Sequence, residues 1–457
     1  MSEIKQQRQS AVERRRKTLI VGLGATGLSC ARYLSSRGVP LAVTDSRDHP
    51  PGLDRLLEDL PDTALFLGGF SAAAFAAAER LIVSPGVALA EPMIQAAIAA
   101  GVPVLGDVEL FCQVAAAPYV AITGSNGKST VTTLLGEMAA AQGINVAVGG
   151  NIGRPVLDLL DAQAELYVLE LSSFQLETTE SLQPVAATVL NLSPDHLDRY
   201  PGLAGYAQAK GKVYRAAQAR VFNRDDAAVM AMCGQGGKEK FFGVGEPEEG
   251  QYGLRRGAGE FYLARGEALL LPVSQLLIPG RHNQSNALAA LALGEALELS
   301  LEGMLETLRR FRGLPHRTQF VRELRGVRWY NDSKGTNTGA TIAALDGLAE
   351  SAARNTLLLA GGEGKGADFS ELAPAVARNV RCAILFGRDA GLIEQALAPH
   401  TRVLRAADLA QAVALADAEA ESGERVLLSP ACASFDMFRN YAHRGEMFMD
   451  LVMGLRE

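Results

Sequence analysis

The sequence has few cysteines, one tryptophan and no long hydrophobic run. Its five cysteines are odd in number, widely spaced and never arranged as Cys-x-x-Cys, so they predict free thiols rather than disulfides or a zinc site. No stretch has the length and apolarity of a membrane span, and the N-terminus lacks the apolar core of a secretory signal. We therefore expect a cytoplasmic protein.

The sequence also lacks an excess of positive charge. It has 44 Lys and Arg against 51 Asp and Glu, a net charge of −7, which argues against general binding to nucleic acids or acidic membranes. The basic run 14–17 lies in a polar N-terminal extension and is expected to be a solvated tail. A chain of 457 residues is too long for one core and suggests roughly three domains.

A glycine-rich turn is the strongest motif that is present: Gly124-Ser125-Asn126-Gly127-Lys128-Ser129-Thr130. The apolar run 119–122 predicts a buried strand before it, and 131–141 predicts a helix after it. This order gathers backbone N–H groups and the positive end of a helix dipole, as in a polyphosphate site. Lys128 would reach the outer phosphates, and the Ser129 or Thr130 hydroxyl could bind Mg²⁺. Only two residues separate the glycines, so the loop is shorter than the full pattern; a chance Gly-Lys-Ser turn is the competing interpretation.

A second glycine-rich turn lies near the N-terminus, where strand 18–21 leads into Gly22-Leu23-Gly24-Ala25-Thr26-Gly27. A predicted helix, 28–37, and a predicted strand, 41–44, ending in Asp45, complete the context of a diphosphate fingerprint. The motif predicts a diphosphate at the helix N-terminus, with Asp45 and Ser46 near the attached group. NAD and a UDP-sugar both contain a diphosphate with an attached group, so either would fit this motif. Glycines that only allow helix and strand to pack closely are the third interpretation.

Polar residues follow several predicted strands in the middle of the chain. Asn151 lies in a glycine-rich turn, and Glu170 ends the buried strand 166–169, where a Mg²⁺ ligand or a simple cap would fit. His196 lies in a polar loop after a strand, which favours a ligand or proton-handling role over a core histidine. Asn283 and Asn286 begin a strongly helical stretch, where they could cap the helix or bind a base.

The last third of the chain alternates predicted strands and helices, which favours an α/β domain with a parallel sheet. The predicted segments are 327–330, 338–345, 356–360, 372–376, 383–386 and 426–428. Polar clusters again follow strands, at 331–337, 361–365 and 429–435. Ligand loops of open α/β sheets lie at such carboxyl ends, so this domain is expected to bind a small ligand.

The order of these motifs resembles the ATP-dependent Mur ligases of peptidoglycan synthesis, over nearly the whole chain after residue 17. The Asn126-Gly127-Lys128 turn is shared with folylpolyglutamate ligases, whereas the D-glutamate-adding members are better marked by the stretches 331–337 and 428–436. The Asp-Asn-Pro-Arg signature of diamino-acid-adding relatives is absent from the sequence. The resemblance implies three α/β domains: a Rossmann-like UDP-binding domain at 1–106, a P-loop ATPase-like domain at 107–313, and a Rossmann-like domain for the incoming amino acid at 314–457.

The resemblance also assigns roles residue by residue. The UDP-substrate would bind Gly24, Thr26, Asp45, Ser46 and Asn151. ATP would bind Gly124, Ser125, Asn126, Gly127, Lys128, Ser129, Thr130, Asn283, Asn286, Arg317, Asp332 and Lys334. D-Glutamate would bind Thr336, Lys365, Ser434, Phe435 and Tyr441. Two Mg²⁺ ions would be held by Ser129, Glu170, His196 and Lys210, the last as a CO₂-derived carbamate, with Lys128, His196 and Lys210 as the catalytic set. Lys210 is preferred to Lys212 because of its spacing from His196.

The implied reaction joins D-glutamate to UDP-N-acetylmuramoyl-L-alanine through an acyl phosphate, with ADP and phosphate as the other products. We expect a monomer without nucleic-acid partners or stable membrane association. A related ligase that adds another amino acid is the nearest alternative. An NAD-dependent oxidoreductase and a nucleotide-binding sensor without turnover are alternatives of different classes.

Overall fold

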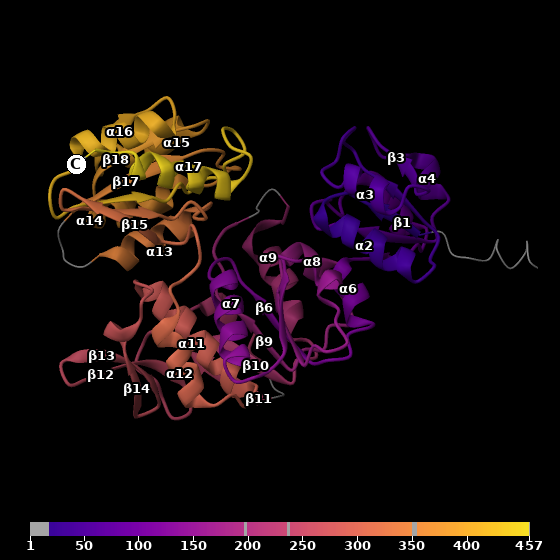
Figure 1. The fold of residues 1–457 in the computed structure, drawn as a ribbon, viewed down its shortest axis with the longest axis horizontal. Helices are drawn as coiled ribbons and strands as arrows, with labels where there is room; N and C mark the ends of the chain where they lie inside the picture. The colour runs from indigo at the N-terminus through magenta and orange to yellow at the C-terminus, as the bar shows by residue number, and fades with distance from the viewer. Residues whose placement is uncertain (1–17, 196–198, 235–237, 350–353, 457) are drawn as a thin grey trace, which may run out of the picture.

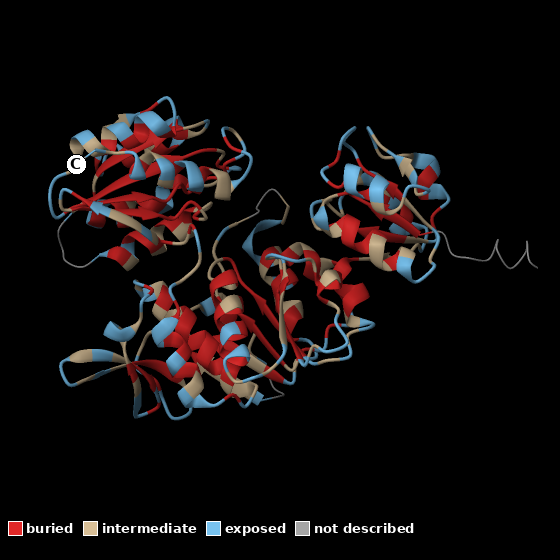
Figure 2. Ribbon diagram, viewed as in Figure 1, coloured by how far each residue is buried: buried red, intermediate tan, exposed pale blue. Residues whose placement is uncertain are grey.

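A computed structural model describes residues 18–195, 199–234, 238–349 and 354–456. Within these ranges the chain forms three β-sheets of five, nine and six strands. Each sheet belongs to its own α/β domain, and the indigo N-terminal and yellow C-terminal domains lie on either side of the central one (Figure 1). Buried residues concentrate in the strands and the inner helix faces (Figure 2). The three-domain α/β fold expected from the sequence is confirmed.

The N-terminal sheet is parallel and has the order β3-β2-β1-β4-β5. Ile20 packs on the α2 side, whereas Leu19 and Val21 pack against α4 and α5, so both faces of the strand are buried. Helix α2 begins at Ala25, three residues before the expected start. The elements are β1 (Thr18–Val21), α2 (Ala25–Ser36), β2 (Leu41–Thr44), α3 (Leu53–Asp59), β3 (Ala64–Phe66), α4 (Ala72–Ala76), β4 (Arg80–Val83), α5 (Pro92–Ala99) and β5 (Val104–Leu105).

The central sheet has the order β14-β13-β12-β11-β10-β9-β6-β8-β7, parallel except for the hairpins that join β12, β13 and β14. Its strands are β6 (Tyr119–Thr123), β7 (Val146–Gly150), β8 (Leu166–Glu170), β9 (Ala186–Val189), β10 (Ala219–Asn223), β11 (Lys238–Phe242), β12 (Tyr252–Gly257), β13 (Glu260–Arg265) and β14 (Ala268–Pro272). Its helices are α6 (Asp107–Cys112), α7 (Lys128–Ala140), η1 (Val156–Leu159), α8 (Ser173–Glu177), α9 (Gly202–Gly211), η2 (Lys212–Tyr214), α10 (Ala227–Met230), η3 (Val273–Gln275), α11 (Arg281–Ala296) and α12 (Leu301–Arg310). Helix α11 is buried all round from Asn286 to Gly294 and packs against α7, so the two helices form the centre of this domain.

The C-terminal sheet has the order β15-β16-β20-β17-β18-β19. The expected parallel sheet is found in β16, β20, β17, β18 and β19, and the edge strand β15, which was not expected, runs antiparallel to β16. Arg325 and Gly326 join these strands with φ angles of 52° and 76°, the left-handed values of a tight two-residue hairpin. The elements are β15 (Gln319–Leu324), β16 (Val327–Asn331), α13 (Thr338–Leu348), β17 (Thr356–Gly361), η4 (Phe369–Leu372), α14 (Ala373–Asn379), β18 (Val380–Phe386), α15 (Ala390–Leu397), β19 (Arg402–Arg405), α16 (Leu409–Glu419), β20 (Arg425–Leu428) and α17 (Tyr441–Met453).

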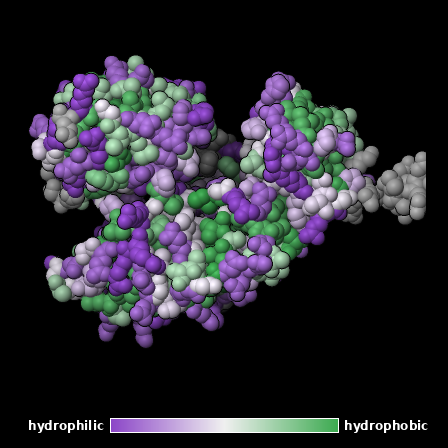
Figure 3. All heavy atoms as spheres, in the orientation of Figure 1, coloured by the Kyte–Doolittle hydropathy of each residue, from purple (hydrophilic) through white to green (hydrophobic). Residues whose placement is uncertain are grey.

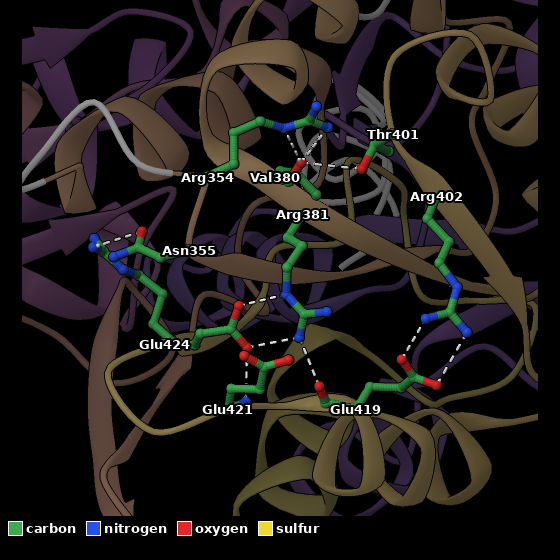
Figure 4. Close-up of polar contacts among 10 residues, drawn as sticks. Arg354, Asn355, Val380, Arg381, Thr401, Arg402, Glu419, Glu421 and Glu424 are labelled. Carbon is green, nitrogen blue, oxygen red and sulfur yellow. Dashed lines mark hydrogen bonds and ion pairs between the residues drawn. The ribbon is translucent and has the colours of Figure 1, made fainter.

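Ion pairs join the segments around the amino ends of the strands in this C-terminal sheet. Arg381, near the start of β18, donates from Nε and Nη2 to the two carboxylate oxygens of Glu424, at 2.5 and 2.7 Å. Arg402, at the start of β19, forms a second bidentate pair with Glu419 (Figure 4). The polar clusters at 331–337, 361–365 and 429–435 follow the carboxyl ends of the strands. Ion pairs therefore join the segments at the amino ends of the strands, and the loops lie at the carboxyl ends.

The surface in view mixes hydrophilic and hydrophobic residues over all three domains (Figure 3). In the described ranges, no helix combines the length and the apolarity that a membrane span requires.

Candidate active site

The predicted phosphate loop lies between β6 and α7. Gly124 and Gly127 have φ angles of 146° and 84°, which L side chains rarely adopt. A Cβ on Gly127 would lie 2.4 Å from Oδ1 of Asn286, so the loop has no room for a side chain there. Helix α7 begins at Lys128, three residues before the expected start, with no side chain capping its first N–H groups. Those N–H groups and the helix dipole can therefore serve an anion.

Two oppositely charged side chains are buried at this loop. Lys128 donates through Nζ to the carbonyls of Gly124 and Ser125, at 2.9 and 3.0 Å, and burial lowers its pKa. Glu170, at the end of β8, accepts from Asn151 Nδ2 at 2.7 Å through Oε1, whereas its buried Oε2 has no hydrogen-bond partner among the described residues. Burial alone would raise the pKa of Glu170, but the charge of Lys128 and the side-chain contacts with Ser129 and Asn151 outweigh it and hold the pKa below its usual value. A buried, ionised and half-satisfied carboxylate is suited to a cation.

Lys210 and Lys212 differ sharply in their surroundings. The buried Lys210 donates to Thr123 Oγ1 at 3.2 Å and lies 4.6 Å from the Tyr206 ring centre. Burial and then the charge of Lys128 lower its pKa well below the usual value. Lys212 instead pairs with the exposed Glu180 at 2.8 Å.

Another expected metal ligand, His196, lies outside the described residues. Across the described ranges, no three His, Cys, Asp or Glu side chains gather into a metal cluster. A cation at the phosphate loop would therefore draw on Glu170 together with the hydroxyl of Ser129.

A cleft of about 290 Å³ lies between the phosphate loop and the C-terminal domain. It brings together eight expected ATP-site residues from distant parts of the chain: Asn126, Gly127, Thr130, Asn283, Asn286, Arg317, Asp332 and Lys334. Arg317 crosses the domain boundary, and its Nη2 donates to Ser129 Oγ at 2.7 Å. Asn283 caps no N–H group; its Nδ2 donates to the carbonyl of Pro279 at 2.7 Å. The cleft therefore joins two domains at one phosphate loop.

Burial also shifts the titration of two groups on the C-terminal side of this cleft. It raises the pKa of Asp332 to about 6, although Ser429 Oγ donates to Oδ2 at 2.7 Å. Burial, followed by the charge of Arg317, lowers the pKa of Lys334 to about 8. The Lys334 ammonium lies 3.9 Å from the ring centre of Tyr441. Tyr441, expected beside the amino acid, thus packs against Lys334, a residue expected in the ATP site.

A second cavity, of about 530 Å³, lies between the N-terminal and central domains. Its lining includes all five residues expected to bind the UDP-substrate: Gly24, Thr26, Asp45, Ser46 and Asn151. Both carboxylate oxygens of Asp45 are already engaged, since Oδ2 accepts from Leu23 N at 2.7 Å and Arg47 contacts both oxygens. Asp45 therefore anchors the glycine-rich turn in this structure.

A third cavity, of about 160 Å³, lies against the loops of the C-terminal domain. It is lined by Thr336 and Lys365, two of the expected D-glutamate residues, and by Asp195. Of the others, Ser434 is buried and Phe435 is 66% exposed, and neither lines this cavity.

Sequence reasoning missed three residues that hold the loops together. Asn191, after β9, accepts from Asn126 N at 2.8 Å and donates to its carbonyl at 3.0 Å. Asn337 donates to Asn126 Oδ1 at 3.4 Å and to Asp195 Oδ2 at 3.2 Å. Gln175 lines the second cavity and donates to the buried Asp107 at 3.1 Å. Each stands in a polar stretch after a strand, and that position was the only signal available.

Three family models match the chain in the order of its domains. Residues 16–106 match the MurD-like N-terminal domain of Mur ligases, 122–294 match the Mur ligase middle domain, and 316–432 match the Mur ligase glutamate ligase domain. The chain belongs to the Mur ligase family. The resemblance inferred from the motifs is thereby confirmed.

Curated Mur ligases are similar over nearly the whole length. The UDP-N-acetylmuramoylalanine–D-glutamate ligase of Marinobacter nauticus is 54% identical over 440 residues, which cover 96% of this chain and 98% of the relative. The protein of the same name from Nitrosococcus oceani is 52% identical over 436 residues, covering 95% and 96%.

Solved Mur ligase structures share the fold at low identity. The UDP-N-acetylmuramate–alanine ligase of Thermotoga maritima aligns with a TM-score of 0.61 and 19% identity, covering 96% of this chain and 99% of its own. A pseudomurein peptide ligase of Methanothermus fervidus aligns with a TM-score of 0.62 and 17% identity, covering 96% and 100%. These structures are similar to this chain in their three-domain fold.

Proposed function

We propose that this chain is an ATP-dependent ligase that joins D-glutamate to UDP-N-acetylmuramoyl-L-alanine in the synthesis of peptidoglycan precursors. One observation carries the proposal: Asn151 lines the N-terminal cavity and also donates to Glu170 beside the phosphate loop. A substrate held by its UDP group in that cavity would extend toward the site where ATP is cleaved. The names of the curated relatives support the choice of substrates.

Each domain would bind one substrate. Domain 1–106 would hold UDP through its glycine-rich turn, since the turn and the start of α2 face the cavity. Domain 107–313 would hold ATP, with Lys128 on the outer phosphates and Asn283 and Asn286 nearer the base. Domain 314–457 would hold D-glutamate around Thr336, Lys365, Ser434 and Phe435, and Tyr441 would act through Lys334.

Two magnesium ions would complete the site. Glu170 Oε2 and the Ser129 hydroxyl would bind one ion, because Oε2 is a buried carboxylate oxygen without a hydrogen-bond partner among the described residues. His196 and Lys210 would serve the other. Magnesium supplies positive charge to the phosphate oxygens when it is bound.

We further propose that Lys210 carries a carbamate. An amine must be neutral to react with CO₂, and burial lowers the pKa of Lys210 toward that state. The carbamate would turn a buried cation into an oxygen ligand. Lys212 lacks this environment because it is paired with Glu180 on the surface.

The reaction would begin when the alanyl carboxylate oxygen attacks the γ-phosphorus of ATP, releasing ADP and leaving an acyl phosphate. The amine of D-glutamate would then attack the acyl carbon, and phosphate would leave as the amide forms. The first step brings two anions together: unit charges at ~4 Å repel by roughly 4 kcal/mol at an effective dielectric of 20. The charges of Lys128, at the phosphate loop, and of Lys334, in the cleft lining, would offset this repulsion.

The proposed compartment is the cytoplasm, where ATP and nucleotide sugars are available. The five cysteines are free thiols in the structure, which suits a reducing compartment. We propose that the enzyme acts as a monomer, since each substrate has a cavity within one chain.

A phosphate-release assay tests the function. Purified protein is mixed with ATP, Mg²⁺ and UDP-N-acetylmuramoyl-L-alanine, and D-glutamate is compared with L-glutamate, D-alanine and a diamino acid. We expect phosphate release to require D-glutamate, and mass spectrometry to find the new amide. Phosphate release at the buffer level with D-glutamate would overturn the choice of substrate. The Lys128→Ala variant controls for a contaminating ATPase.

A further inference from the structure

Arg444 of helix α17 is a fully buried cation in the C-terminal domain. Its guanidinium donates from Nη2 to the Ser333 carbonyl at 2.8 Å and from Nε to the Ser333 hydroxyl at 3.0 Å. It also donates to the Cys432 carbonyl from Nη1 and Nη2, both at 3.2 Å, and to the Ala433 carbonyl from Nη1 at 3.5 Å. In the described part of the chain, these five hydrogen bonds all end on neutral oxygens.

The acceptors belong to two loops that follow different strands. Ser333 lies in the nucleotide loop, residues 331–337, between Asp332 and Lys334 of the ATP cleft. Cys432 and Ala433 lie in the amino-acid loop, residues 429–436, just before Ser434. The amino-acid loop is joined in turn to the loop of Lys365, because Ala433 and Glu363 exchange backbone hydrogen bonds at 2.9 and 3.0 Å. Arg444 therefore links the ATP side of the site to the amino-acid side.

The choice of arginine fits this role. A buried charge is costly unless its hydrogen bonds are satisfied, and removal of the guanidinium would also leave the buried Cys432 carbonyl without these donors. A planar guanidinium has five N–H donors in a fixed fork, which lets one side chain hold two loops at a set spacing. A lysine keeps the charge but cannot reproduce that geometry.

Both loops have further anchors. Ser429 Oγ, in the amino-acid loop, donates to the Asp332 carboxylate, and the Ala431 N–H donates to the Gly335 carbonyl at 2.9 Å. At the Cys432 carbonyl, however, both hydrogen bonds from the described residues come from Arg444. Loss of Arg444 would therefore act on the amino-acid loop at Cys432 and Ala433, directly before Ser434.

We propose that Arg444 is a positioning residue that sets the amino-acid loop against the nucleotide loop, so that the incoming amine meets the activated carboxyl group. The inference rests on the proposed function for its kinetic consequences only. It predicts that Arg444 acts on amino-acid binding without touching the amino acid.

The test compares Arg444→Lys and Arg444→Met with Arg425→Lys. Arg425 is an equally buried arginine of the same domain, but it lies at the amino end of β20, where Nη2 donates to Asn355 at 3.0 Å. For both Arg444 variants we expect the KM for D-glutamate to rise at least tenfold. We expect the Kd of a non-hydrolysable ATP analogue to change less than threefold. Arg425→Lys should lower the melting temperature without moving this KM.

A measurement without substrate separates this inference from the proposed function. Amide hydrogen exchange should become faster in residues 429–436 of Arg444→Lys and remain unchanged there in Arg425→Lys. Unchanged exchange, or a KM for D-glutamate equal to that of wild type while kcat follows the folded fraction, would overturn the role of Arg444. If the wild-type protein makes no ADP with D-glutamate, the proposed function fails. The hydrogen-exchange result alone then decides whether Arg444 holds the amino-acid loop. Should Arg444→Met not fold, Arg444→Lys carries the comparison.

Discussion

At the scale of single residues, the site is marked by buried amines. Lys128, Lys210 and Lys334 come from three different segments, and burial lowers the pKa of each. Buried cations without full compensation cost stability, and such groups concentrate where a ligand supplies the missing charge. Lys128 and Lys334 are therefore suited to an anionic partner, whereas Lys210 is the lysine that we propose to be carbamylated.

The pKa of Lys334 gives a pH prediction. Burial and the charge of Arg317 lower the pKa from 10.5 to about 8, and bound phosphates would raise it again. Binding at alkaline pH would then take up a proton. We expect nucleotide affinity to fall as pH rises above 8, by up to about tenfold per pH unit. In Lys334→Arg the charge persists, so calorimetric titrations of an ATP analogue from pH 7 to 9.5 should give a flatter profile. Equal slopes in both proteins would contradict the assignment.

The two neighbouring lysines give a matched pair of variants. Lys210→Arg should reduce kcat by about a hundredfold or more while the melting temperature stays near that of wild type, because arginine cannot carry the carbamate. Lys212→Arg should stay within about twofold of wild type, since its surface ion pair contributes little. Phosphate release measured with and without added bicarbonate checks both. Near-normal turnover of Lys210→Arg would move the carbamate elsewhere, with Lys212 the next candidate.

At the scale of elements, the phosphate loop depends on helix α11 as well as on its own strand and helix. Asn286 of α11 lies against Gly127, and Asn191 after β9 brackets Asn126 with two hydrogen bonds. The loop is thus held in shape by two elements distant from it in the sequence. A side chain at Gly127 would disturb both the backbone and this support.

Two glycine substitutions separate the backbone strain of a side chain at positive φ from the loss of support by Asn286. Gly127→Ala should weaken nucleotide binding at least tenfold, because its Cβ would meet Asn286 Oδ1 at 2.4 Å. Gly143, just after α7, has a nearly identical φ of 85° but open space around a Cβ. Gly143→Ala should cost about 1 kcal/mol of unfolding free energy and leave nucleotide affinity unchanged. Chemical denaturation and calorimetry measure the two quantities. Normal nucleotide affinity in Gly127→Ala would mean that the loop adapts to the clash.

At the scale of the whole molecule, all three cavities are formed where domains meet. The first cleft lies between the central and C-terminal domains, and the second cavity lies between the N-terminal and central domains. The third is lined by Asp195 of the central domain and by Thr336 and Lys365 of the C-terminal domain. Arg317 and Asn337 reach from the C-terminal domain to Ser129 and Asn126 of the phosphate loop. The relative positions of the domains thus determine whether the cavities are complete, and substrate-driven closure would be expected to affect turnover.

Because the phosphate loop and the second cavity are separate sites, we expect a change in the ATP site to leave binding of the UDP-substrate largely intact. Lys128→Ala should abolish ATP turnover, because the outer phosphates lose their lysine. It should leave the affinity for UDP-N-acetylmuramoyl-L-alanine within about threefold of wild type, since Gly24, Thr26 and Ser46 lie in the other cavity. Titration of the UDP-substrate without ATP measures this. A large loss of that affinity would show that the two sites are coupled more tightly than their positions suggest.

The sequence by itself determined the features that contiguous residues encode. A glycine turn between a strand and a helix defines its own backbone, so the phosphate loop and the N-terminal turn could be located from residue order alone. Helix starts were placed three residues late at both turns, because neither Ala25-Thr26-Gly27 nor Lys128-Ser129-Thr130 carries an apolar periodicity. The antiparallel strand β15 was missed because its Arg-Gly turn was not recognised as a hairpin signal. The role of His196 stays a prediction.

Only the tertiary structure decided which distant residues meet. Arg317 contacts Ser129 across 188 positions, and Asn337 contacts Asn126 across 211. Nothing local distinguishes Arg444 from the exposed arginines of the chain until α17 packs it beneath two loops. Likewise, Lys210 and Lys212 are two residues apart in the sequence. Only the packing of α9 and η2 buries Lys210 and leaves Lys212 paired with the exposed Glu180. Local patterns fix backbone shape, whereas burial and charge environment depend on which elements pack together.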